Sequence, residues 1–149
     1  MLPPRIDATA VRDRIGRYAD AKASQEERGA IYKELIGFVP PRIEARLAVT
    51  GALDPKLLDL QEQMREHAMY PACFDVKTAQ LMLFGMLLMD GSDATTLHGI
   101  AARRAGASWE ELQAVISLCF LFRGLPAANR GAEILANIAK REVETDAQG

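Results

Sequence analysis

Residues 76–106 read VKTAQLMLFGMLLMDGSDATTLHGIAARRAG, and this stretch decides the fold. Its first half carries apolar residues on nearly every helical face, which is typical of a central helix enclosed by other helices. Asp90-Gly91 then predicts a turn, and Ser92 or Asp93 can cap a second, shorter helix. The stretch therefore predicts two consecutive helices, of which the first is the buried centre of the molecule.

His98 lies on the first turns of the shorter helix, directly after this apolar segment. An imidazole there could form a small-molecule site, because burial and the field of a helix terminus both change its affinity for protons. For an isolated histidine the commoner interpretation is structural, with the ring bonded to a neighbouring backbone group. The residues alone leave both interpretations open.

The chain after Gly106 continues as helices. Ser108 and Glu111 form a capping-box pattern ahead of a helix over residues 109–123, and the Gly106 break between two helices implies an antiparallel hairpin. A glycine and a proline then open a last helix. The polar residues 140–149 that follow it are predicted to form a flexible tail.

The first half of the chain shows weaker helical patterns, again bounded by capping residues and prolines. No segment shows the sustained alternation of a strand, so the fold class is predicted to be all-α. The helices expected there are residues 7–21, a helix from the Ser24/Glu27 capping box to Phe38, residues 42–49 ended by Gly51, and a helix opened by Asp54-Pro55 and ended by Pro71.

Composition narrows the class of protein. The 149 residues fit one domain, and 49% hydrophobic residues are ample for a core. A formal charge of -2 argues against nucleic acid and anionic membrane surfaces as partners. The longest apolar run is too short to span a bilayer, and the start of the chain lacks the apolar block of a secretory signal, so a cytoplasmic location is expected.

Few side chains in the sequence suit metal or thiol chemistry. Cys73 and Cys119 lie in apolar contexts and are predicted to be buried, reduced thiols. The two histidines, His67 and His98, are not spaced with carboxylates or cysteines as metal ligands are, so no metal is expected. The methionines of the central helix, at positions 82, 86 and 89, are predicted to fill gaps in the core.

Three segments, taken in order and with their spacing, resemble the carboxymuconolactone decarboxylase family: FDVKTAQL (74–81), LHGIAARRAGASWEEL (97–112) and FRGLPAANRGAEIL (122–135). The resemblance implies an alkylhydroperoxidase-D-like helical bundle built round a helical hairpin. It divides the chain into an N-terminal helical extension (1–70), a family core (71–139) and the tail. It also implies a homo-oligomer, trimer or hexamer, with its site near subunit contacts.

This sequence departs from the family's peroxidase pattern, CxxCxxxH. Aligned on His98, the cysteine positions hold Gly91 and Ala94, or Ser92 and Thr95 after a shift of one residue. Disulfide-cycling peroxidases need a thiolate and a resolving thiol, so this activity is not expected.

The family's acidic residues are also missing. The acidic position on the preceding helix falls at Gln80, or at Ala79 in the ungapped register, and the position four before the histidine holds Ala94. Glutamine can donate and accept hydrogen bonds but cannot exchange a proton as a carboxylate does. The resemblance therefore supports a site at His98 more strongly than it supports one reaction.

The function predicted from the resemblance is that of a cofactor-independent lyase acting on a small carboxylated lactone or oxo-acid, with His98 as general acid/base. Arg123 is a candidate for binding the substrate carboxylate, although a favourable interaction with its own helix terminus explains it equally well. Arg130 and Arg104 are weaker candidates. The remaining predicted substrate-binding residues are Gln80, Ser92 and Thr95.

Two alternatives accompany this prediction. One is an oligomeric small-molecule-binding protein of the same fold that has little or no catalytic activity. The other is a thiol peroxidase using Cys73 or Cys119, which the absent CxxC makes the weakest of the three.

Overall fold

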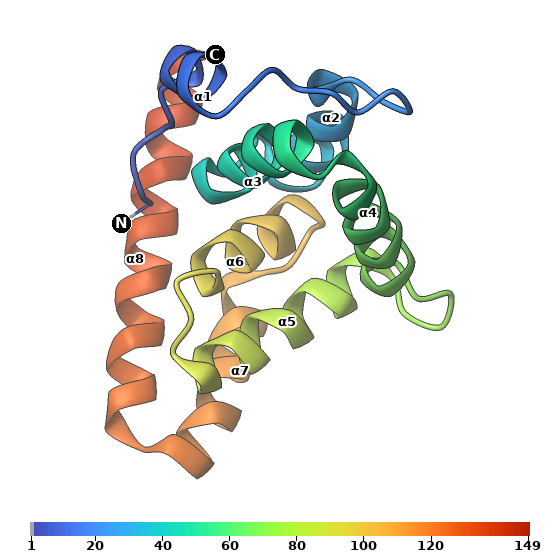
Figure 1. The fold of residues 1–149 in the computed structure, drawn as a ribbon. Coiled ribbons are helices and arrows are strands. Elements are labelled where there is room, and N and C mark those ends of the chain that lie inside the picture. Colours follow the sequence, from blue (N-terminus) through green and yellow to red (C-terminus); the bar gives the residue numbers. More distant parts are fainter. Residues whose placement is uncertain (1) are drawn as a thin grey trace. The chain divides into compact units, whose positions relative to one another are not determined.

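The computed structural model describes residues 2–149, and these form eight α-helices and no β-strand, so the all-α prediction is confirmed (Figure 1). Contacts between Cα atoms divide the chain into one compact unit that ends at Pro71 and a second that begins at Ala72. No helix in this described part is both long and apolar enough to cross a bilayer. The helices are α1 (Ala8–Arg14), α2 (Gln25–Ile36), α3 (Pro41–Leu53), α4 (Pro55–Met69), α5 (Val76–Asp90), α6 (Thr95–Arg104), α7 (Trp109–Arg123) and α8 (Leu125–Gln148).

The second unit consists of two helical hairpins that share one core. Helix α5 packs against α6, α7 and α8, and α8, the long orange to red helix of Figure 1, also packs against α6 and α7. The fully or nearly fully buried side chains of this core come from all four helices and are Phe84, Leu88, Ala101, Ala102, Leu112, Ile116 and Ile138.

Most of the helix starts that were predicted from capping side chains are confirmed. Both capping boxes are present, Ser24 with Glu27 at α2 and Ser108 with Glu111 at α7. Asp54 accepts a hydrogen bond from the backbone N–H of Leu57 at the start of α4. Each of these side chains pairs with backbone N–H groups that a helix start leaves without a partner, which is why the local sequence is sufficient to place them.

Three boundaries in the chain differ from the prediction. The first helix is shorter, Ala8–Arg14, because Gly16 takes a positive φ of 149°. Gly51 does not end α3 but lies within it. A Cβ atom built there would stand 2.4 Å from the ring of Tyr18, so this glycine provides room for an aromatic side chain.

The third difference is the polar tail, which continues α8 through Gln148. Arg103 joins this part of α8 to α6, since its Nε lies 2.8 Å from Glu142 Oε1 and its Nη2 3.1 Å from Oε2. The Cζ atom of the same guanidinium lies 4.1 Å from the ring centroid of Trp109. A two-point ion pair and a ring contact thus give residues 140–149 more support than their composition indicates.

The predicted burial of three side chains is wrong. Met82 and Met86 are 42% and 57% exposed, because α6, α7 and α8 leave one face of α5 uncovered. Cys73 is exposed in the segment before α5, whereas Cys119 is buried as predicted. A helix with apolar residues on every face is therefore not necessarily covered on every face by the other helices of its unit.

Gly131 lets α8 approach α7 closely. A Cβ atom there would lie 2.7–2.9 Å from three side-chain atoms of Ile116. We expect Gly131→Ala to destabilise the protein by about 1–2 kcal/mol, because overpacking costs about 1–3 kcal/mol and the gain in helix propensity offsets about 1 kcal/mol. Urea unfolding measures this difference. In an Ile116→Ala background the same substitution should become stabilising, and destabilisation of equal size in both backgrounds would contradict the steric explanation.

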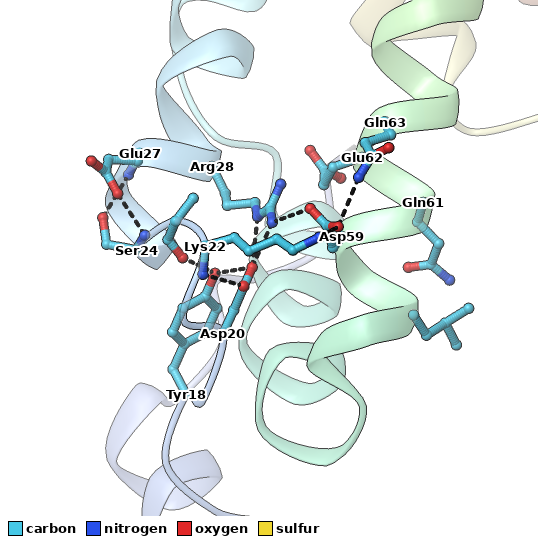
Figure 2. A network of polar contacts seen from close by, with 12 residues as sticks. Tyr18, Asp20, Lys22, Ser24, Glu27, Arg28, Asp59, Gln61, Glu62 and Gln63 are labelled. Atoms are coloured by element: carbon cyan, nitrogen blue, oxygen red, sulfur yellow. Dashed lines mark hydrogen bonds and ion pairs between the residues drawn. The ribbon is translucent and has the colours of Figure 1, made fainter.

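The first unit is held by a network of charged side chains, which Figure 2 shows between α2, α4 and the segment before α2. Arg28 Nη2 lies 2.6 Å from Asp20 Oδ2 and 2.9 Å from Asp59 Oδ1. Lys22 Nζ lies 2.6 Å from the other oxygen of Asp59. Hydrogen bonds from Lys22 and Arg28 hold the pKa of Asp59 below its usual value.

A second buried group lies beside this network in the same unit. Tyr32, fully buried, donates its hydroxyl to the carboxylate of Glu62, which also pairs with Arg46. Burial raises the pKa of Tyr32 to about 12, so the hydroxyl keeps its proton and remains a donor at neutral pH. Polar groups at the core of this unit are therefore satisfied by one another.

Candidate functional site

His98 is placed by the turn between α5 and α6. Gly91 ends α5 with a φ of 70°, and α6 begins at Thr95 with Ala94 as its N-cap. The predicted capping by Ser92 or Asp93 is wrong, because no side chain caps α6. The Ser92 hydroxyl instead accepts from the Ala94 N–H at 3.2 Å, before the helix starts.

The structure brings His98 together with Gln80. The Nδ1 atom of His98 lies 2.7 Å from Oε1 of Gln80, on the facing side of α5. Gln80 is fully buried, while His98 is half-buried. The two predicted site residues therefore form one pair, with the glutamine on the inner side and the imidazole between it and the surface.

Gly99 explains why the two helices come close enough for this bond. A Cβ atom at Gly99 would lie 3.2 Å from the ring of Phe84 and 2.7 Å from Cδ1 of Ile138. Phe84 is one turn after Gln80 on α5, so the same helix face carries both contacts. Gly99 is not among the residues predicted for the site, although an isolated glycine within a helical pattern, beside a candidate histidine, is a signal for close packing.

Gln80 and Thr95, two of the residues predicted to bind substrate, lie inside the protein. Both side chains are 0% exposed, so a ligand could reach them only by displacing neighbouring groups. Thr95 donates its hydroxyl to the Ser92 carbonyl at 2.6 Å and thereby fixes the turn before α6. These residues support the position of the site, whereas Ser92 is half-buried and remains near the surface.

The two candidate arginines are placed differently. Arg123 is exposed at the end of α7 and makes no polar contact within residues 2–149. Arg130, on α8, reaches the turn before α6, where its Nη2 lies 3.3 Å from the Ser92 carbonyl and 3.5 Å from Asp93 Oδ1. Its Nε is buried with no hydrogen-bond partner in the described chain. The structure thus brings Arg130, the weaker candidate in the sequence, to the turn that positions His98.

The other candidate residues lie elsewhere. Arg104 is exposed near the end of α6, and His67 is exposed near the end of α4 in the first unit. The Sγ of Cys119 lies 3.6 Å from the Gly85 carbonyl, and burial raises the pKa of this thiol, which disfavours the reactive thiolate. Within residues 2–149 no three His, Cys, Asp or Glu side chains are grouped as a metal site requires.

The arrangement can exchange a proton. An imidazole can act as an acid or a base, and the half-buried ring of His98 is held at Nδ1 by the buried amide of Gln80. Arg130 adds a cation at the neighbouring turn.

Comparison with known proteins identifies the family of this chain. The family model described as Carboxymuconolactone decarboxylase family matches residues 55–137, which is more than half of the chain and includes α4 to α7 and the first half of α8. Searches of curated proteins and of solved structures gave no significant match. The resemblance of the three sequence segments is thereby confirmed, and the chain belongs to the carboxymuconolactone decarboxylase family.

Proposed function

We propose that this chain is a cofactor-independent lyase, similar in its chemistry to carboxymuconolactone decarboxylase, that acts on a small carboxylated lactone or oxo-acid. The observation that carries the proposal is the His98–Gln80 pair, a half-buried imidazole fixed at one nitrogen by a fully buried amide. Family membership supports the same class of reaction.

Decarboxylation of such a substrate has three requirements. The carboxylate must be held by a cation, the electrons released with CO2 must be stabilised as an enolate, and an acid must return a proton to carbon. In this proposal His98 supplies the proton. An arginine holds the carboxylate, since a guanidinium can bind both of its oxygens.

The test is turnover by the full chain. Unsaturated lactone acids and small oxo-acids are incubated with the protein, and CO2 release is followed together with loss of substrate absorbance. We expect at least one member of this panel to release CO2 catalytically. Binding of panel members in calorimetry, without CO2 from any of them, would contradict the lyase.

That outcome would support the second candidate, a binding protein of the same fold. The observation that favours it is Gln80, because an amide at the family's acidic position cannot relay a proton as a carboxylate can. A thiol peroxidase has less support, since Cys119 is buried with a raised thiol pKa and Cys73 lies outside a CxxC pair.

Arg130 is our choice for the carboxylate-binding cation, and Arg123 is the alternative from the sequence. We expect Arg130→Gln to raise KM about 10–100-fold, because a hydrogen bond to a charged group contributes about 1.5–3 kcal/mol. Steady-state kinetics on the substrate identified above measure this change, with Arg123→Gln as the matched control. The reverse pattern would assign the role to Arg123, and an unchanged KM in both variants would contradict an arginine clamp.

We also propose that the protein works as a homo-oligomer. Large apolar side chains stand exposed on α5 and on the second half of α7, and Phe122 is 83% exposed. Apolar surface of this kind commonly marks protein contacts, and a further copy of the same chain is the partner that family membership favours. Light scattering on the purified chain should give the mass of several copies, whereas a monomer at micromolar concentration would contradict this proposal. A cytoplasmic location remains a prediction from the sequence.

A further inference from the structure

We infer that Gln80 is a positioning residue that holds His98 in the tautomer with its proton on Nδ1. The inference comes from the geometry of the pair and deepens the proposed function, on which its catalytic meaning rests. It concerns Gln80, for which the sequence predicted a substrate contact instead.

The tautomer follows from the chemistry of the two atoms that meet. The amide oxygen of glutamine accepts hydrogen bonds and has no proton to donate. At 2.7 Å from Gln80 Oε1, Nδ1 of His98 must therefore carry the proton of this bond. In the neutral ring the lone pair then lies on Nε2, and in the charged ring Nε2 carries the second proton.

The packing around the pair makes this orientation hard to change. Gln80 is fully buried, so rotation of its amide would take place against its packed surroundings. The missing side chain at Gly99 keeps α6 close to α5 at the level of Phe84, which shortens the distance that the amide must bridge. A ring flip of His98 would break the Nδ1 bond to Gln80 and replace it with a different geometry.

A neutral residue bonded to His98 also affects the imidazole differently from an acidic residue. A carboxylate in the place of Gln80 would favour the charged imidazolium through its own charge, whereas the amide oxygen accepts from Nδ1–H in both states of the ring and carries no net charge. Gln80 thus fixes the orientation of the ring without placing a charge beside it. The bond persists while Nε2 gains and loses its proton, which suits a group that must work in both directions.

The test is a two-bond ¹H–¹⁵N NMR spectrum of the full chain with ¹⁵N-labelled histidine. The chain has two histidines, and His67 on the exposed end of α4 is the internal reference. At a pH where both rings are neutral, we expect His98 to show a protonated Nδ1 and an unprotonated Nε2. The opposite pattern for His98 in the parent protein would overturn the inference without any variant.

Two variants extend the test. In Gln80→Leu the acceptor is lost, and His98 should lose its Nδ1–H preference while His67 is unchanged. In Gln80→Glu the acceptor stays and gains a charge, and the titration midpoint of His98 should rise by about 1–3 pH units. A His98 tautomer that is unchanged in folded Gln80→Leu would also overturn the inference.

The spectra separate this inference from the proposed function. The expected tautomer in a protein with no turnover would leave Gln80 as a positioning residue and contradict the lyase. Turnover in a protein whose His98 carries its proton on Nε2 would support the lyase and overturn the role of Gln80.

Discussion

His98→Gln is expected to lower kcat by about 10²–10⁴-fold, because general acid/base catalysis by a positioned side chain contributes a factor of this size. Glutamine has a similar reach and can form hydrogen bonds, but it cannot exchange a proton at neutral pH. The measurement is the initial rate of CO2 release at saturating substrate. Circular dichroism and the unfolding midpoint should stay near the parent values, since His98 is half-buried and outside the packed core.

The matched control is His67→Gln, which changes the other histidine of the chain, exposed near the end of α4. It should leave kcat within about twofold of the parent, as expected for a surface substitution away from the site. A folded His98→Gln protein with the parent's kcat would contradict proton transfer by this residue.

Arg28→Met is expected to lower the free energy of unfolding by about 3–5 kcal/mol, the usual cost of removing one partner of a buried ion pair. Arg28 is the shared partner of Asp20 and Asp59, and the side chain of Asp20 is only 2% exposed. Without the guanidinium, a carboxylate would remain in the interior without its cation. Urea unfolding at pH 7 measures the difference.

The matched control is Arg12→Met, since Arg12 pairs with Asp13 in a surface contact with more than half of each side chain exposed. An exposed pair of this kind contributes about 0–1 kcal/mol. Equal destabilisation by the two substitutions would contradict the role of the Arg28 network.

The same network has a pH signature. Burial opposes ionisation of Asp20, but the Lys22 backbone N–H and Arg28 outweigh it and hold the pKa of Asp20 below its usual value. A carboxyl with a lowered folded-state pKa stabilises the fold above its unfolded pKa, about 3.9, and this contribution is lost as the pH falls further. The stability difference between the parent and Arg28→Met should therefore be full at pH 7 and shrink below about pH 4.

The features of the fold that the sequence predicted are those set by local chemistry. The capping boxes at Ser24 and Ser108 need only residues three positions apart, and they lie where expected. Gly51 was misread, because whether a glycine ends a helix or makes room within it depends on a side chain distant in sequence, here Tyr18. The turn before α6 was misread for a similar reason, since its polar groups pair with one another rather than with the helix.

The candidate site also combines features that local sequence predicts with features that depend on the packing of distant residues. The register of the family segments identified His98 and Gln80 as candidate site residues, but it did not predict the direct bond between them. That bond depends on how closely α5 and α6 pack, which is set by Gly99. The sequence pattern likewise could not predict whether the methionines on α5 are buried, because their burial depends on how many helices cover that face.

Gly99 also makes the geometry of the His98–Gln80 pair depend on the packing of the core. Its open side faces Phe84 and Ile138, neither of which carries a reactive group. A change of size at either position would alter the spacing of α5 and α6 and thus the length of the bond between Gln80 and His98. Apolar substitutions inside the core can therefore change the geometry of the imidazole–amide pair while both polar residues stay the same.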